Sequence, residues 1–532
     1  MAEIKMNSQK RTVKFTLLAF VLLSTGLFTN AQEKYWVYFK NKTKPVENPQ
    51  EYLSINALQR RMAARTNICD STDWPVDTGY IAKIRSTGVK TGFSSRWMNA
   101  VAVSANKNDI TKIKNFAFVK AVEPMQYFAA TTASLRKESP AGVDNELLVA
   151  QLKSMQGDEF IKRGINGKGI RIAVFDGGFP GVDTNPVFAH LRENHQIIKT
   201  YDFVNKTENV YGYMTHGASV LSCIAGIYGD KNMGLATGAE FLLARTEIKP
   251  EIKVEEEYWM AAMEWADQNG ADIISSSLGY TDKRYTVKQM NGRSTLVTRA
   301  ATIAAKKGML VLNAMGNDGR ENWEVMGAPA DADSVLSIGG TDPFTGYHIN
   351  FSSFGPTADY RLKPNICAPG AAMVASSGSI KKGYGTSYST PLVSGFAACV
   401  WQLNREKTNM EIFDLVEKSG HLYPYFDYAH GYGIPQASYF FKEKKQADEN
   451  LNPIKIVKEP ETMDISVSDL SRSDEKYLNY LYYHIQRPDG VLKYYAVLDV
   501  TENEVVSVPV SKLENGDIIR VYYKGYIREM NY

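Results

Sequence analysis

Cysteine is scarce in this chain and shows no metal-binding or redox spacing. The 532 residues contain four cysteines, Cys69, Cys223, Cys367 and Cys399, and none stands in a CxxC motif. This excludes a zinc ribbon or a thioredoxin-like redox site. Cys223 and Cys399 lie in apolar, helix-like runs, where a free thiol packs as a small hydrophobic group. If Cys69 leaves with an N-terminal segment, at most one disulfide can form within the rest.

Dense basic runs are also lacking. The formal net charge is only +3, and no block of Lys and Arg stands beside interleaved aromatic residues. This excludes the electrostatic footprint of a nucleic-acid-binding protein. What is present is 44% hydrophobic and 22% charged residues, a composition typical of soluble globular proteins. The length predicts two to four domains.

A long apolar run occurs only at the N-terminus. Lys10, Arg11 and Lys14 precede the apolar residues 15–28, and short residues ending at Ala31 follow. This arrangement is typical of a cleaved secretory signal, so we predict a signal peptide over residues 1–31. The alternative is a membrane anchor, but the run is shorter than the roughly 20 residues needed to span a bilayer. We therefore expect an exported protein that is secreted, periplasmic or on the cell surface, with no transmembrane segment in the mature chain.

Residues 32–130 predict a small α+β domain. The runs 35–39, 99–103 and 118–122 are rich in β-branched and aromatic residues, and a helical stretch covers residues 110–116. A polar stretch of small residues follows. Such a composition is typical of linkers and of sites of proteolytic cleavage. We predict a linker with a processing site over residues 131–145.

From residue 146 to 445 the pattern changes to strands that are apolar throughout, alternating with helices. The expected strands are residues 170–175, 241–245, 272–276, 309–313 and 334–338, and the clearest helices are residues 258–268 and 296–307. Uniformly apolar strands fit a parallel sheet that is buried on both faces. We predict an α/β domain with a doubly wound, mostly parallel sheet, whose ligands bind at the carboxyl ends of the strands.

The tail, residues 453–532, alternates apolar and polar residues. The runs 480–486 and 491–500 flank the turn sequence Arg-Pro-Asp-Gly at 487–490. This predicts an antiparallel hairpin within a small C-terminal β domain.

Two residues in the α/β region are candidates for proton transfer. Asp176 directly follows the apolar strand and precedes two glycines, and His216 stands in a Thr-His-Gly segment that opens a helix-like run. Either alone could be a turn or capping residue. Histidine, however, has the pKa suited to taking a proton from a hydroxyl near neutral pH.

Two further residues could form a nucleophile and an oxyanion site. Ser387 lies in the segment Gly-Thr-Ser-Tyr-Ser-Thr-Pro at the head of a helix, where backbone N–H groups favour an anion. Asn317 lies in Gly-Asn-Asp-Gly beyond an expected strand, and its amide is a suitable donor to an oxyanion. The alternative, purely structural interpretations are a helix cap for Ser387 and a turn residue for Asn317.

Taken together, these four residues resemble the subtilisin-like serine protease family. The order Asp, His, Asn, Ser along one α/β domain matches the order in that family. The resemblance covers about residues 145–442 and includes Ser-Ser-Leu-Gly at 276–279, Asn-Phe-Ser-Ser-Phe-Gly-Pro at 350–356 and Cys-Ala-Pro-Gly at 367–370. The chain departs from the family in having Gly177 and Gly178 after the aspartate, and in Met315, Tyr388 and Ser389 where small residues are usual.

The resemblance implies a serine endopeptidase made as an inactive precursor. Asp176, His216 and Ser387 would be its catalytic triad, and Asn317 would donate to the oxyanion. Substrate would lie against Ser277, Leu278 and Gly279, and the pocket beside the scissile bond would be lined by Ala314, Met315, Gly316 and Gly327. Residues 32–130 would be a propeptide that inhibits the enzyme, the alternative being a permanent binding domain.

No cofactor is expected, and no metal site is assigned. Calcium is common in the family, and Asp202, Asp331 and Asp333 could ligate it, but no ligand set with EF-hand spacing is present and a charged turn is the favoured interpretation. Protein or peptide substrates are the expected partners. Two other functions stay open: a catalytically silent pseudo-protease that binds peptides or attaches to a surface, and acyl transfer to an amine in place of water.

Overall fold

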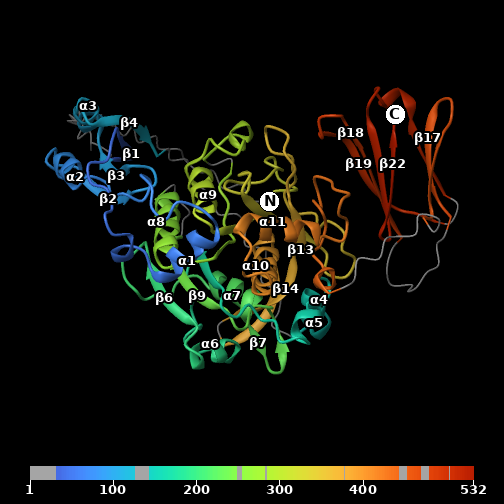
Figure 1. Cartoon of the computed structure of the whole chain (residues 1–532), viewed down its shortest axis with the longest axis horizontal. Coiled ribbons are helices and arrows are strands. Elements are labelled where there is room, and N and C mark those ends of the chain that lie inside the picture. Colours follow the sequence, from blue (N-terminus) through green and yellow to red (C-terminus); the bar gives the residue numbers. More distant parts are fainter. Residues whose placement is uncertain are drawn as a thin grey trace, which may run out of the picture.

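The computed structural model describes residues 32–125, 143–248, 254–281, 284–376, 378–441, 452–468, 479–501 and 504–532. Three folded parts follow one another along the chain (Figure 1). The expected signal peptide and most of the expected linker lie outside the described residues. No helix in these ranges is long and apolar enough to cross a membrane.

The N-terminal part is an antiparallel sheet with short helices. Its strand order is β2-β3-β1-β4. The alternation along β1 sends Val37 into the domain's own core and Trp36 into a cluster shared with the central part. The elements are β1 (Glu33–Phe39), α1 (Ile55–Ala63), α2 (Thr78–Arg85), β2 (Lys90–Ser95), β3 (Ala100–Ala105), α3 (Lys107–Lys114) and β4 (Val119–Pro124). The predicted α+β domain is confirmed.

The central part contains a seven-stranded sheet in the order β13-β12-β11-β10-β5-β9-β6. Every pair of neighbouring strands is parallel. Its strands are β5 (Arg171–Asp176), β6 (Ile197–Asp202), β9 (Glu240–Arg245), β10 (Ile273–Ser276), β11 (Leu310–Ala314), β12 (Val335–Thr341) and β13 (Ile366–Pro369). The five expected strands are confirmed. The other two were not predicted, because β6 is half exposed at the sheet edge and β13 is only four residues long.

Helices cover both faces of this sheet, which explains why its strands are apolar throughout. Along β5, Ile172 and Val174 point into one core cluster, while Ala173 and Phe175 point into the other. Two helix pairs are prominent. Helix α7 (His216–Ala225) packs against α10 (Thr386–Leu403), and α8 (Val254–Gln268) packs against α9 (Leu296–Lys306). The remaining elements are α4 (Asn145–Lys153), α5 (Asp158–Ile161), α6 (Ala189–Glu193), β7 (Ile227–Tyr228), β8 (Lys231–Asn232), β14 (Ala371–Ser376), β15 (Ser379–Tyr384) and α11 (Asn409–Lys418).

The order of the strands positions the functional edge. After β5 the chain builds β6 and β9 on one side of it, and then crosses to build β10 and the later strands on the other. A ligand of such a sheet binds at the carboxyl ends of the strands where this reversal occurs. That point lies between β5, which ends at Asp176, and β10, which ends at Ser276.

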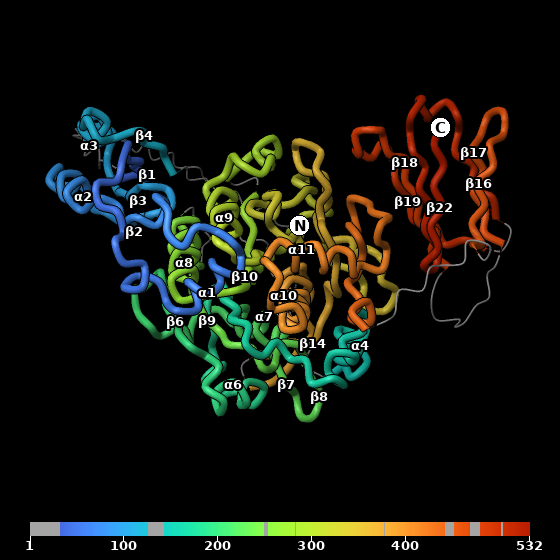
Figure 2. The backbone as a smooth tube through the Cα atoms, in the orientation of Figure 1, coloured from blue at the N-terminus to red at the C-terminus, as the bar shows by residue number. Residues whose placement is uncertain are grey.

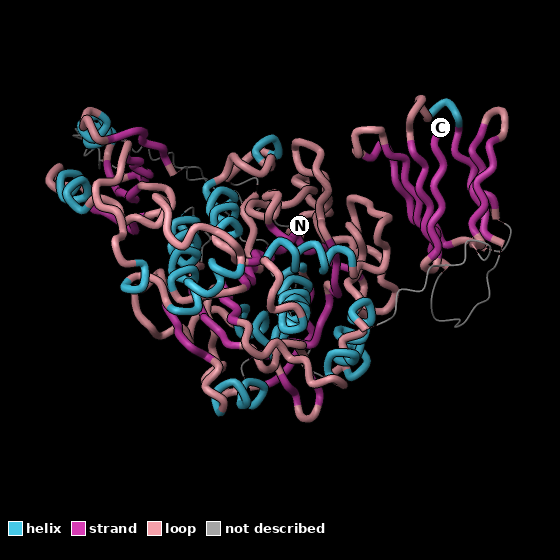
Figure 3. The backbone as a smooth tube through the Cα atoms, in the orientation of Figure 1, coloured by secondary structure: helices cyan, strands magenta, loops and turns pink. Residues whose placement is uncertain are grey.

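The C-terminal part consists almost entirely of strands, drawn in magenta in Figure 3. It has two antiparallel sheets, β16-β17-β20 and β19-β18-β21-β22. The predicted hairpin is confirmed as β18 paired with β19. The strands are β16 (Ile454–Lys458), β17 (Thr462–Val467), β18 (Tyr480–Gln486), β19 (Leu492–Asp499), β20 (Val505–Pro509), β21 (Ile518–Tyr523) and β22 (Tyr526–Asn531). In Figure 2 this part and the N-terminal domain lie on opposite sides of the central part.

Candidate active site

Asp176 and His216 form a hydrogen-bonded pair at the carboxyl edge of the sheet. Asp176 is the last residue of β5 and is fully buried, and His216 is the first residue of α7. His216 Nδ1 lies 2.8 Å from Asp176 Oδ2, and the backbone N–H of Gly177 donates to Asp176 Oδ1 at 2.7 Å. With Nδ1 held by the carboxylate, Nε2 is the ring nitrogen left to exchange a proton with another group.

The carboxylate changes the basicity of the imidazole. Burial lowers the pKa of His216, but the charge of Asp176 and the hydrogen bond from Nδ1 raise it more, so the pKa of His216 lies above its ordinary value of 6.5. A ring that is neutral just above this pKa is suited to remove a proton from a hydroxyl near neutral pH.

Ser387 is the second residue of α10. The ring of the next residue, Tyr388, has its centroid 5.9 Å from that of His216, so the first turn of α10 lies beside the imidazole. The Ser387 hydroxyl donates to the carbonyl of Ser277 at 3.4 Å. Among the described residues no hydrogen bond joins Ser387 to His216, so the hydroxyl is turned toward the segment after β10.

Asn317 is held beside the same helix start. Its Oδ1 accepts from the backbone N–H of Thr386 at 2.9 Å and from the Thr386 hydroxyl at 3.1 Å. Because the oxygen is occupied by these two bonds, the NH₂ group is the end of the amide that can donate to a ligand next to Ser387. The four expected residues thus lie at one edge of the sheet although they are spread over more than two hundred positions.

The comparisons with known proteins agree with this geometry. Residues 167–433 match the subtilase family, Peptidase S8, which is half of the chain. The chain belongs to the subtilase family. Residues 34–141 match a second family, the Peptidase S8 propeptide domain of Bacteroidota.

Individual subtilases are distant in sequence. The minor extracellular protease Epr of Bacillus subtilis (strain 168) is 26% identical over 330 residues, 60% of this chain and 46% of that protein. The serine protease AprX of the same organism is 26% identical over 305 residues, 51% of this chain and 66% of that protein. The chain therefore spans less than two thirds of the length of these two relatives. Subtilisin BL of Lederbergia lenta is 28% identical over 252 residues, 47% of this chain and 82% of that protein.

A solved structure supports the fold. The crystal structure of a mutant of the epidermin leader peptide processing serine protease EpiP from Staphylococcus aureus superposes with a TM-score of 0.54 at 16% identity. The match covers 76% of this chain and 98% of that one. The predicted subtilisin-like fold is therefore confirmed.

The segments expected to bind substrate lie together in this subtilase. Tyr280, which follows Ser277, Leu278 and Gly279, forms an antiparallel bridge with Ala328. The N–H of Gly327 donates to the carbonyl of Met315 at 3.1 Å, which joins the segment after β11 to the same wall. Gly279 is exposed and has open space where a side chain would stand, whereas Leu278 is 5% exposed.

Met315 and Ala314 are both buried, but only Met315 belongs to the large core cluster behind this wall. Met315 is fully buried in the core cluster that also contains Leu278 and Tyr280, so its side chain packs behind the wall. Ala314 is 4% exposed and Gly316, which follows, is partly exposed. The methionine side chain is therefore part of the core, and the partly exposed position in this segment is Gly316.

The carboxylates considered for calcium have partners within the protein. Asp202 is paired with Arg245, with Arg245 Nη1 2.9 Å from Asp202 Oδ2. Asp331 accepts from the Thr298 hydroxyl at 2.6 Å and from the Gly292 N–H at 2.8 Å. No cluster of three metal-ligating side chains occurs within the ranges that the structure describes.

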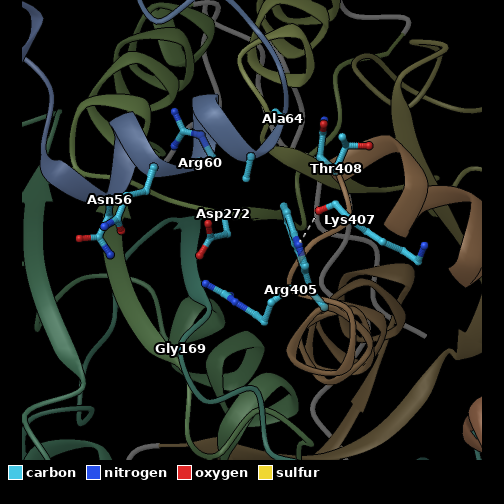
Figure 4. A pocket seen from close by; sticks show the side chains of 12 residues that line it. Asn56, Arg60, Ala64, Gly169, Asp272, Arg405, Lys407 and Thr408 are labelled. Carbon is cyan, nitrogen blue, oxygen red and sulfur yellow. Dashed lines mark hydrogen bonds between the residues drawn. The ribbon is translucent and has the colours of Figure 1, made fainter.

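A cavity of about 130 Å³ lies at the other edge of the sheet (Figure 4). It is bounded by Asp272 and Gly169, which precede β10 and β5, and by Arg60 of α1 and Arg405. Since Asp176 and Ser276 are at the opposite ends of those two strands, the cavity is separate from the active-site edge.

Sequence reasoning missed a buried ionic network that joins the N-terminal part to α8. The arginines Arg60, Arg61 and Arg96 all contact Asp267 of α8. Arg96 also pairs with Glu264 at 3.1 Å. Each residue alone resembles an ordinary surface charge, and only the docking of two domains places them in one buried group.

Proposed function

We propose that this chain is a serine endopeptidase with Asp176, His216 and Ser387 as its catalytic triad. The observation that carries the proposal is the 2.8 Å contact between His216 Nδ1 and the buried Asp176 carboxylate, at the edge where α10 presents Ser387. A rotation about the Cα–Cβ bond of Ser387 would turn its hydroxyl from Ser277 toward His216 Nε2. Such hydrogen bonds are often long or misaligned without substrate and tighten when it binds.

Each residue then has one role. Ser387 Oγ attacks the peptide carbonyl while His216 Nε2 removes its proton and later delivers it to the leaving amine. Asp176 keeps the His216 tautomer and stabilises the imidazolium. In deacylation, His216 Nε2 removes a proton from water, which attacks the acyl-enzyme carbonyl. The bond to Ser387 Oγ then breaks, the proton returns to Oγ and the carboxylic acid product leaves. The Asn317 amide and the Ser387 backbone N–H hold the tetrahedral oxyanion.

Substrate binding follows from the same edge. An extended peptide would pair its backbone with Ser277, Leu278 and Gly279, and main-chain hydrogen bonds would supply most of the affinity. The residue before the scissile bond would enter beside Ala314, Gly316 and Gly327. Because Met315 packs into the core, we expect selectivity to depend little on its side chain.

We further propose that the enzyme is exported as a precursor and processes itself. The parts are a signal peptide at 1–31, a propeptide at 32–130, a linker at 131–145, the peptidase domain at 146–445 and the C-terminal β domain at 453–532. The match of residues 34–141 to a propeptide family supports this organisation, as does the docking of the N-terminal domain on α8. One relative, Epr, is an extracellular protease, which supports export.

Two measurements test the proposal. The wild-type protein should react with a fluorophosphonate probe and hydrolyse a denatured protein substrate, while Ser387→Ala should do neither. Ser379→Ala, which alters an exposed serine on β15, is the matched control and should behave as wild type. A wild-type protein that binds peptides yet fails to react with the probe would instead be a pseudo-protease.

Mass spectrometry tests the self-processing. Only wild type should lose an N-terminal segment that ends within residues 129–145, and Ser387→Ala should keep it. If both proteins retain residues 32–130, that domain is a permanent part of the enzyme.

A further inference from the structure

We propose that Arg245 is a positioning residue that holds the Asp176–Gly177 turn in place for His216, with Tyr213 covering it. This inference rests on the proposed triad and adds two residues to its support. Neither residue belongs to the expected substrate or catalytic set, and both follow from contacts at the ends of β5, β9 and β6.

The register of the sheet places three charged residues in one row. Arg245, the last residue of β9, stands opposite Asp176 at the end of β5 and opposite Asp202 at the end of β6. Asp202 is fully buried and Arg245 is 6% exposed. With Arg245 Nη1 2.9 Å from Asp202 Oδ2, the guanidinium is fixed on one side, and its Nε is directed toward the residue after β5.

Arg245 reaches the catalytic pair through one residue, Gly177. Its Nε donates to the carbonyl of Gly177 at 3.2 Å. The N–H of the same glycine donates to Asp176 Oδ1 at 2.7 Å, and Asp176 Oδ2 contacts His216 Nδ1. Arg245, held by its ion pair with Asp202, thus binds the residue whose N–H orients the carboxylate. Among the described residues, no hydrogen bond joins Arg245 to Asp176 itself.

Tyr213 covers the exposed side of the guanidinium. The Arg245 Cζ lies 3.5 Å from the centroid of its ring, and its hydroxyl accepts from Asn205 Nδ2 at 2.6 Å. Its φ is +72°, a left-handed conformation that a bulky residue rarely adopts. Such a conformation persists only where surrounding contacts enforce it, and it clusters at functional sites.

The two glycines after Asp176 fit this arrangement. A side chain on Gly177 would begin 1.8 Å from the Met214 side chain, and one on Gly178 would begin 2.2 Å from the carbonyl of Gly212. The segment 212–214 therefore occupies the space that side chains at 177 and 178 would need. The Asp-Gly-Gly sequence departs from the usual family pattern. Its two glycines leave room for the segment 212–214, which packs over them.

The test compares Arg245→Met with Arg171→Met. Arg171 and Glu240 form an ion pair between β5 and β9 at the other ends of these strands, with Arg171 Nη2 2.6 Å from Glu240 Oε2. This control therefore removes an arginine and its ion pair from the same sheet at the edge away from the site. We expect Arg245→Met to lower kcat for a short peptide substrate by about 10- to 100-fold with KM changed less than about twofold, because a small displacement of catalytic groups has a large effect on rate. Arg171→Met should keep the wild-type kcat.

A second variant, Tyr213→Gly, tests the same positioning role if Arg245→Met folds poorly. Glycine adopts positive φ freely, so this variant should fold while it uncovers Arg245. We expect a smaller loss of kcat, and in both variants a shifted or broadened ¹H NMR signal of the proton between His216 Nδ1 and Asp176. Full-length protein is used in both measurements.

If Arg245→Met and Tyr213→Gly change only the thermal midpoint and leave kcat and the proton signal as in wild type, the positioning role is wrong. Failure of the triad itself would look different, because Ser387→Ala would then retain activity. The proton signal can be measured whether or not the protein cleaves peptides.

Discussion

Arg61 of the N-terminal domain and Asp267 of the central domain form an ion pair of 2.7 Å in which neither side chain is exposed. Asp267 also forms ion pairs with Arg60 and Arg96. Burial alone would raise the pKa of Asp267, but the charges of these arginines hold it below its usual value. Asp267 is buried among three arginines of the N-terminal domain, so the docking of that domain depends on the Asp267 carboxylate.

Asp267→Ala should therefore weaken the docking of the N-terminal domain. Removing one partner of a buried pair leaves uncompensated charge and costs about 3–5 kcal/mol. In a Ser387→Ala background, hydrogen exchange should become faster in α1 and α8. Asp158→Asn breaks an exposed pair with Lys162 and should change neither. Unchanged protection in Asp267→Ala would mean that other contacts hold the domain.

The Asn317→Ala variant should fold normally but hydrolyse substrate more slowly than wild type. The lost amide donor to the oxyanion should lower kcat about 100- to 1000-fold, the magnitude measured in the subtilisin family itself, with KM little changed. Steady-state kinetics on a chromogenic peptide measure this. A large rise in KM with kcat intact would assign Asn317 to substrate binding.

The pH dependence of activity should follow His216. The base must be neutral, and the pKa of His216 is raised by Asp176, so activity should be present above this pKa and be lost as pH falls through it. We expect the acidic limb of kcat/KM to have its midpoint above the ordinary histidine value of 6.5. A midpoint below that value in the free enzyme would contradict the assignment of this group.

Acid should destabilise the junction between the central part and the C-terminal β domain. His484 of β18 is fully buried, donates from Nδ1 to the carbonyl of Phe426 at 2.6 Å and stacks on Tyr425. Burial, with a smaller contribution from Arg520, lowers the pKa of His484 to about 4, although the hydrogen bond to Phe426 opposes this change. Burial also lowers the pKa of His348 and His421 to about 4.

The sign of the effect follows from these values. The unfolded histidine binds a proton near pH 6.5 and the folded one near 4, so the stability that His484 contributes is present above 6.5 and is lost as pH falls toward 4. His484→Gln, which keeps a donor but does not titrate, should reduce this loss by up to about 3 kcal/mol. Urea unfolding at about pH 7 and pH 4 measures it, and an equal pH loss in both proteins would refute the role of His484.

Gly177→Ser should be harmful alone and tolerated together with Met214→Ala. A side chain at 177 would begin 1.8 Å from Met214 Cε, the end of a flexible side chain, so the single change forces Met214 out of its present packing at a cost of about 1 kcal/mol. Shortening Met214 makes room for it. The double-mutant cycle in thermal stability and kcat should therefore be strongly non-additive. Additive effects would mean that the contact is relieved in another way.

Much of the fold could be predicted from the sequence because its strands are apolar on both faces. The alternation of Ile172 and Val174 with Ala173 and Phe175 between two cores makes β5 uniformly apolar, and the same holds for the other predicted strands. Strand β6 escaped prediction because it is half exposed. The extra strands of the C-terminal domain escaped because short amphipathic runs are weak signals.

The sequence alone predicted the order of the four site residues and the strand or helix end on which each stands, because both depend on local composition. These residues are Asp176, His216, Asn317 and Ser387. The burial of Met315, the arginine cluster around Asp267 and the support of Gly177 by Arg245 were not predicted. Those features arise where segments far apart in the chain meet. Charge, burial and distance there depend on the neighbours that folding brings together, and no single segment specifies them.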